Sequence, residues 1–173
     1  MKIPFSKVLK YSRRTTILAI VGGLIVILGG SSAYAAHSNA LPGSPLYPLK
    51  QLWEQGSLLL SFSPAAKAQV HLNIAQDRIK AAQSSPTPIP VLVPTLQTVQ
   101  QNLHDALNQS SNVTDQSQRN EIKKSVSDAA SEAEKEAEQE SRSSVESSSS
   151  DKQDIQSSRD QIKQIQNQAS ADD

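Results

Sequence analysis

Three histidines, His37, His71 and His104, are the side chains in this sequence best suited to bind a transition metal or to exchange a proton near neutral pH. No two of them are three or four residues apart, so one helical turn cannot bring a pair onto one face. The chain has no cysteine, and the nearest acids to His71 and His104 are single residues, Asp77 and Asp105. These spacings differ from those of known zinc sites, so we expect neither a metal site nor a cofactor.

Serine and glutamate are abundant, but their spacing does not suggest chemistry. No serine lies in a nucleophile elbow, and the glycine-rich stretches fall inside an apolar segment instead of a phosphate-binding loop. Alternate glutamates from Glu132 to Glu140 are distributed around a helix and indicate a solvated face, with weak cation binding as the alternative. We therefore expect no catalytic residues and no enzymatic activity.

The formal net charge of zero is an average over two unlike regions. Five basic residues precede position 15 and no acid occurs before Glu54, so the remainder carries 12 basic and 17 acidic side chains. The basic residues of the leader are Lys2, Lys7, Lys10, Arg13 and Arg14. A mildly acidic surface argues against nucleic acid as a partner, because phosphate binding requires clustered Lys and Arg.

A charge-free stretch from Thr15 to Ala36 follows the basic leader, residues 1–14. As a helix its 22 residues would extend about 33 Å, enough to cross a hydrocarbon core of about 30 Å. Basic residues stay on the cytoplasmic side of such segments. The sequence predicts a single-pass transmembrane helix at 15–36 in contact with membrane lipid, with a cytoplasmic N-terminus and an extracytoplasmic C-terminus.

A signal peptide is the alternative interpretation of the same segment. Ala33-Tyr34-Ala35 has the A-x-A pattern of a signal peptidase site, with cleavage between Ala35 and Ala36. Cleavage would release a secreted or periplasmic protein. The full membrane length of the segment and its long basic leader favour retention.

The outer region is predicted to be all-α, and residues 40–112 are predicted to form a small three-helix domain. Ser44-Pro45 and Ser63-Pro64 each resemble an N-cap followed by proline in the first helical turn. Four prolines between 84 and 94 predict an extended connection before the third helix. Apolar residues recur at helical spacing in all three segments: Leu49, Leu52, Trp53, Leu59 and Leu60; Ala68, Leu72, Ala75 and Ile79; Leu92, Leu96, Val99, Leu103 and Ala106.

Residues 113–173 differ sharply in composition, because they are rich in Ser, Glu and Gln. Asp115 and Gln118 resemble a capping box, and thin apolar seams follow at Ile122, Val126, Ala129, Ala133 and Ala137 and at Ile155, Ile162 and Ile165. We expect a solvated helical stalk or a partly disordered tail, with self-association as a coiled coil or binding of a protein partner.

A proline-rich box lies just after the apolar segment and continues into the next two helices. It comprises Pro42, Gly43, Pro45, Tyr47, Pro48, Trp53, Phe62 and Pro64. With Lys50 and His71-Leu72, it resembles the "PGDxLYPxK" box of an uncharacterised bacterial family, over about residues 40–83. The resemblance implies an extracytoplasmic location and no known activity, and Ser44 and Ala66 replace acids that are common in that family. The box is interpreted as a structural turn and core anchor, with a peptide or ligand groove as the alternative.

Together these patterns predict a non-enzymatic, membrane-anchored, extracytoplasmic helical protein that serves as an interaction or envelope-structural module. The alternative is a cleaved, exported helical protein that binds a small ligand, a metal or a peptide. Both share the all-α fold and differ in the fate of residues 15–36.

Overall fold

The computed structural model describes residues 40–84, 87–143 and 148–171, and these residues form helices and connections without strands. The helices are α2 (Tyr47–Leu60), α3 (Pro64–Gln83), α4 (Ile89–Ser111), α5 (Gln116–Ser143) and α6 (Ser149–Ser170). The predicted all-α class is therefore confirmed for this part of the chain. The basic leader and the apolar segment 15–36 lie outside the described residues. Within the described residues, no helix has the length and apolar character needed to cross a bilayer.

Local sequence signals place two helix starts correctly. The Ser63 hydroxyl accepts a hydrogen bond from the Ala66 backbone N–H at 3.1 Å, and α3 begins at the next residue, Pro64. Asp115 caps α5 in the same way, accepting from the Gln118 N–H at 2.8 Å.

The predicted N-cap at Ser44 is wrong, because α2 begins three residues later at Tyr47. Residues 41–46 form turns instead: the Ser44 N–H donates to the Leu41 carbonyl at 3.0 Å, and the Tyr47 N–H donates to the Ser44 carbonyl at 3.1 Å. Gly43 has a φ of +92°, a conformation that glycine adopts at little cost. This glycine lets the turn form directly ahead of the helix.

The prolines near α4 also act differently from the prediction. The extended connection expected through residue 94 ends at Pro88, and α4 starts at Ile89. Pro90 falls in the first turn, where a missing N–H leaves no bond unmade, whereas Pro94 lies inside the helix and removes one backbone bond. The helix therefore begins before the last of the four prolines and continues through Pro94.

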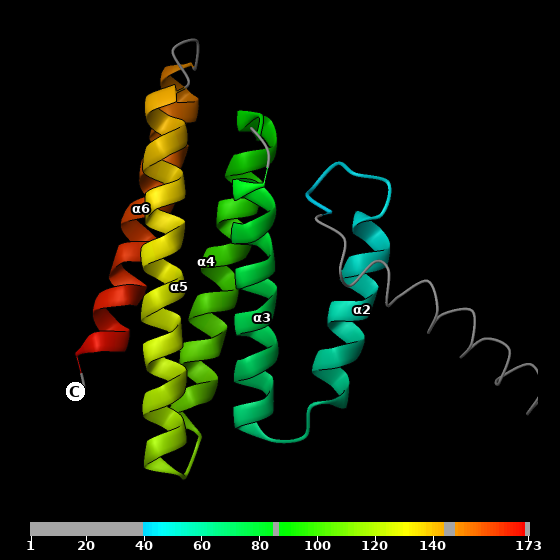
Figure 1. The fold of residues 1–173 in the computed structure, drawn as a ribbon, viewed down its shortest axis with the longest axis vertical. Helices are drawn as coiled ribbons and strands as arrows, with labels where there is room; N and C mark the ends of the chain where they lie inside the picture. Colours follow the sequence, from blue (N-terminus) through cyan, green and yellow to red (C-terminus); the bar gives the residue numbers. More distant parts are fainter. Residues whose placement is uncertain (1–39, 85–86, 144–147, 172–173) are drawn as a thin grey trace, which may run out of the picture.

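Helices α3 to α6 form one antiparallel four-helix bundle in which successive helices run in alternate directions (Figure 1). Each helix packs against its neighbour in sequence, and α3 also contacts α5 while α4 contacts α6. Among the described residues α3 and α6 do not touch, so α4 and α5 meet across the centre of the bundle. Short connections between antiparallel helices are typical of this architecture.

The core is one apolar cluster to which all four bundle helices contribute. It includes Leu72, Ile79, Leu92, Leu96, Leu103, Val126, Ala133, Ile155 and Ile162. On α5, Ala129, Ala130, Ala133 and Ala137 are all buried. Small side chains allow close helix approach, so a seam without aromatic rings can still exclude water.

The predicted three-helix domain with a separate stalk is therefore replaced by a different arrangement. The seams of α5 and α6 are buried against α3 and α4, so these two helices complete the bundle that begins at α3. Helix α2, expected as a full member of the core, contacts only α3 and lies outside the bundle (Figure 1). The predicted seams of α3 to α6 are buried, whereas the predicted stripe of α2 is largely exposed, because helical period alone does not say which surfaces meet.

Glu136 is an acid in an unfavourable position. It lies almost buried on α5, next to the C-terminal end of α3 at Ala82, and Glu140 follows one turn later. Burial, and secondarily the negative charge of Glu140, raises the pKa of the Glu136 carboxyl. The charged form is therefore less stable in the folded chain than in the unfolded chain.

We expect Ala133→Leu to lower the free energy of unfolding by about 1–3 kcal/mol, because the larger side chain overpacks the closed seam. Chemical denaturation measures the effect. Glu132→Leu, one residue earlier and exposed, is the matched control and should change stability far less. Equal tolerance of both substitutions would indicate a solvated α5 and contradict the four-helix bundle.

We expect Glu136→Gln to raise the free energy of unfolding at pH 7 by at least a few tenths of a kcal/mol, the size of one like-charge helical pair. The folded-state pKa is raised, so the carboxylate is unfavourable above that pKa and its cost vanishes below the ordinary value of 4.5. Denaturation at pH 7 and at pH 4 should show the gain only at pH 7. Glu138→Gln should have the opposite sign, because Glu138 pairs with Arg142 and Arg159.

Candidate functional site

Helix α2 directs its charges inward. Its only charged residues, Lys50 and Glu54, are one turn apart and face two adjacent residues of α3, Asp77 and Arg78. Lys50 Nζ lies 3.5 Å from Asp77 Oδ2, and Arg78 Nη2 lies 2.8 Å from each Glu54 carboxylate oxygen, donating a hydrogen bond to Oε2. Two ion pairs therefore connect α2 to the bundle.

Arg78 is the centre of this contact. Its side chain is fully buried, and its guanidinium carbon lies 5.0 Å from the centre of the Tyr47 ring, in range of a cation–π interaction. Its Nε and Nη1 have no hydrogen-bond partner among the described residues. A buried guanidinium is costly to desolvate, so the carboxylate and the ring must together offset that cost.

Burial dominates the ionisation of the two α2 residues. Desolvation lowers the pKa of the Lys50 ammonium although Asp77 opposes the shift, and it raises the pKa of the Glu54 carboxyl although Arg78 opposes the shift. In both cases burial makes the neutral form of the side chain more favourable, relative to the charged form, than it is in water. The pairing limits the cost of burying these charges without removing it.

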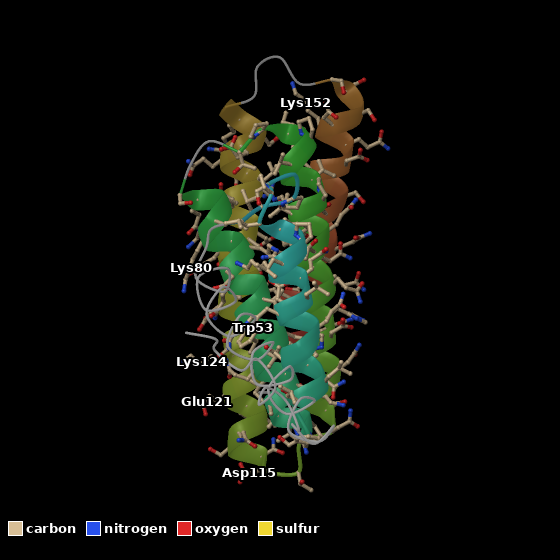
Figure 2. The ribbon with its side chains drawn as sticks, turned by 90° about the vertical axis from the view of Figure 1, so that its right-hand side faces the viewer. Trp53, Lys80, Asp115, Glu121, Lys124 and Lys152 are labelled. Carbon is tan, nitrogen blue, oxygen red and sulfur yellow. The ribbon has the colours of Figure 1, made fainter. Side chains whose placement is uncertain are left out.

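Most of the large apolar residues of α2 are exposed, whereas Leu49 and Leu58 are half-buried. Leu52 is 66% exposed, Trp53 47%, Leu59 81% and Leu60 73%, and Phe62 just beyond the helix is 91% exposed. Trp53 lies at mid-height on α2, which faces the viewer in Figure 2. Complete burial of one such side chain typically gains roughly 1.5–3 kcal/mol, so this surface is strongly unfavourable in water. We call Leu52, Trp53, Leu59, Leu60 and Phe62 the α2 apolar face.

No charged residue interrupts this face. Between Ala40 and Ala66 the sequence contains only Lys50 and Glu54 as charged residues, and both are turned toward α3. The polar side chains exposed beside the leucines are the uncharged Gln51 and Gln55. An uncharged apolar face of this kind typically marks a contact with a protein or a membrane.

The structure divides the residues of the proline-rich box between different environments. Pro42, Gly43 and Pro45 lie in the turns before α2, Pro48 lies in the first turn of α2, and Pro64 starts α3. Tyr47 packs on Arg78 of α3. Trp53 and Phe62 lie on the α2 apolar face, so the core-anchor interpretation does not describe them.

The histidines of the described residues do not form a pair. His71 Nδ1 lies 2.9 Å from Asn102 Oδ1 on α4, whereas His104 Nδ1 lies 3.1 Å from Asn108 Nδ2, one turn along the same helix. Within residues 40–84, 87–143 and 148–171, no three His, Asp or Glu side chains come close enough to hold a metal ion. His37 lies outside these ranges.

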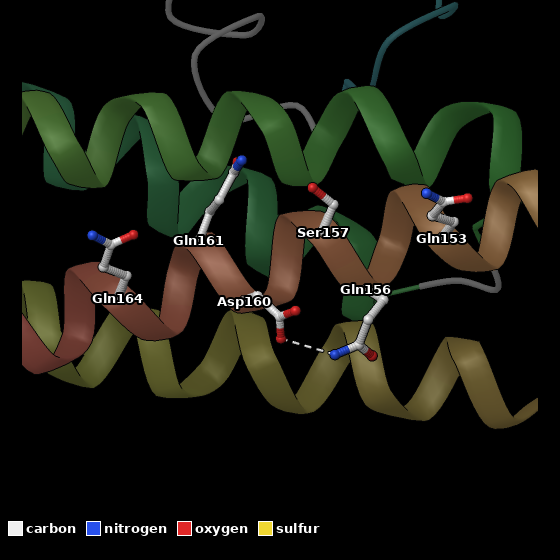
Figure 3. Close-up of a pocket in the computed structure, with 6 residues that line it drawn as sticks. All are labelled: Gln153, Gln156, Ser157, Asp160, Gln161 and Gln164. Atoms are coloured by element: carbon white, nitrogen blue, oxygen red, sulfur yellow. Dashed lines mark hydrogen bonds between the residues drawn. The ribbon is translucent and has the colours of Figure 1, made fainter.

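The surface hollows on the bundle are polar and open. The one shown in Figure 3 is lined entirely by α6, by Gln153, Gln156, Ser157, Asp160, Gln161 and Gln164. Gln156 donates a hydrogen bond to Asp160 at 2.8 Å, so part of its polar surface is already paired. Residues from a single helix cannot enclose a ligand, and this hollow offers no convergent set of groups.

The charged contact between α2 and α3 was missed by sequence reasoning. Lys50 and Glu54 are one turn apart and lie beside the apolar stripe of their helix, and Asp77 and Arg78 are adjacent in a helix with two apolar faces. The one-turn spacing of opposite charges was the available signal, but it is usually satisfied within one exposed helix.

We expect Arg78→Leu to release α2 from the bundle, because it leaves the Glu54 carboxylate buried without its cation; breaking such a pair typically costs about 3–5 kcal/mol. Hydrogen exchange of the amides of residues 47–60 measures the loss. Adding Glu54→Leu should restore much of the protection, because both charges are then gone. Equal loss in the single and double variants would contradict a role for the ion pair.

Comparison with curated proteins gives no significant match, and comparison with solved structures gives none either. A family model does match, and it covers residues 39–172, which include every helix from α2 to α6. The chain belongs to the family described as "Domain of unknown function (DUF5667)".

Proposed function

We propose that this protein is a membrane-anchored extracytoplasmic module without enzymatic activity, in which a single N-terminal helix holds a rigid helical bundle close to the outer side of the membrane. The observation that carries the proposal is the charge-free segment 15–36 behind five basic residues. Its length matches a hydrocarbon core of about 30 Å, and its preceding charges favour a cytoplasmic N-terminus.

The distance between the segment and the bundle supports a structural role. Only three residues separate Ala36 from Ala40, where the described part of the chain begins, and turns follow at once. A tether of this length keeps the bundle beside the membrane. We infer that the module presents its surface to other components at that location.

The form of the bundle fits interaction better than catalysis. Its core is filled by aliphatic side chains from four helices, and the hollows among its described residues, on α6 and between α3 and α5 near Glu136, are open to solvent. An enzyme needs convergent polar groups in an enclosed site. The α2 apolar face offers instead a continuous contact surface.

We expect a periplasmic reporter fused after Asp173 to be active in a bacterial host, and a cytosolic fluorescent reporter at the same place to be dark. Replacing Lys2, Lys7, Lys10, Arg13 and Arg14 together with Gln should reduce the active fraction, because orientation follows the basic residues. Replacing Lys152 and Lys163 with Gln is the control and should change nothing. Cytosolic fluorescence of the unaltered fusion would contradict the proposal.

Alkaline carbonate extraction separates the proposal from its alternative. An anchored chain stays with the membrane and begins at or near Met1. A soluble fraction whose N-terminus is Ala36 would instead support cleavage after Ala33-Tyr34-Ala35 and an exported binding protein.

A further inference from the structure

Among the described residues, the large exposed apolar side chains are concentrated on and around α2. The α2 apolar face holds Leu52, Trp53, Leu59, Leu60 and Phe62, all of them substantially exposed. The same helix turns Lys50 and Glu54 toward the bundle. Charges inside and leucines outside reverse the ordinary arrangement of a surface helix in water.

We propose that the α2 apolar face lies in the headgroup–acyl boundary of the membrane that holds residues 15–36, so that the bundle rests on its side along the bilayer. This inference rests on the proposed function, because it requires the apolar segment to be anchored. It assigns a lipid-binding role to α2, separate from the transmembrane anchor.

The length of the tether brings α2 to the membrane surface. From Ala36 to Leu41 there are five residues, which extend at most about 18 Å. From Leu41 onward the chain folds back in turns, with hydrogen bonds from Ser44 to Leu41 and from Tyr47 to Ser44. The first turn of α2 is therefore held within reach of the headgroups, whatever the orientation of the bundle.

The chemistry of the face fits lipid. Interfacial helices bury leucine and aromatic side chains in the outer part of the acyl region, and tryptophan is enriched at the headgroup level. The face has no Lys or Arg to select anionic lipid, so zwitterionic lipid should suffice. α2 lies alongside α3 at a small tilt and runs in the opposite direction, so the bundle can lie lengthwise on the surface that α2 contacts (Figure 1).

The ion pairs with α3 explain why this orientation is stable. Rotating α2 to bury its leucines against α3 would expose Lys50 and Glu54 but would leave Arg78 buried without a carboxylate. An unpaired buried guanidinium is strongly unfavourable. The pairs therefore hold the leucines away from the bundle and toward the bilayer.

Trp53, the single tryptophan of the chain, lies in this face and reports on its surroundings. The full chain is reconstituted in phosphatidylcholine vesicles, with and without bromine on the upper acyl carbons. We expect Trp53 emission to shift to shorter wavelength, to lose intensity with brominated lipid and to resist quenching by aqueous iodide.

A pair of variants tests the face itself. Leu52→Glu with Leu59→Glu should abolish quenching by brominated lipid and restore quenching by iodide, with helix content unchanged. Gln153→Glu with Gln164→Glu adds the same charge on exposed positions of α6 and should leave Trp53 in lipid.

Each other outcome overturns the inference in a recognisable way. Iodide quenching of Trp53 in a chain that resists carbonate extraction would place α2 in water and leave the anchor intact. Protection from both quenchers would indicate a protein contact, such as a second copy, in place of lipid. Release of the chain by carbonate would remove the proposed function together with this inference.

Discussion

The absence of aromatic side chains after Phe62 is the constraint on which the bundle depends. Without large rings, no pair of these helices can bury much area, because alanine and isolated isoleucines make thin seams. Four helices together bury enough apolar surface to form a core, and the alanines of α5 allow the helices to approach closely. Helices that look like a polar stalk in isolation are necessary because α3 and α4 cannot enclose a core alone.

A second consequence is that the aromatic residues concentrate outside this core. Tyr47, Trp53 and Phe62 all belong to α2 and its flanks, and the first of them packs on Arg78 while the others face outward. The bundle is therefore an aliphatic rod with one peripheral helix that carries its large apolar surface. The buried core therefore lies in α3 to α6, and the exposed apolar surface lies in α2.

Arg78 links these two parts. Its buried charge needs the Glu54 carboxylate, and the pairing fixes the rotation of α2 about its own axis. Because Lys50 lies on the same side and pairs with Asp77, both charges of α2 face α3, whereas Leu52, Leu59 and Leu60 are exposed. Two ion pairs can thus fix the orientation of a helix even when they add little to the free energy of unfolding.

Sequence alone determined the helical class, the start of α3 at Pro64 and the cap of α5 at Asp115, because caps and apolar period are local properties. It also located the seams of α4 and α5. Only the tertiary structure decided which seams meet and which way α2 faces. Periodicity defines a face but not its partner. The apolar stripe of α2 predicts a core contact, whereas the ion pairs with Asp77 and Arg78 turn the charged side of α2 toward the bundle and leave Leu52, Leu59 and Leu60 exposed.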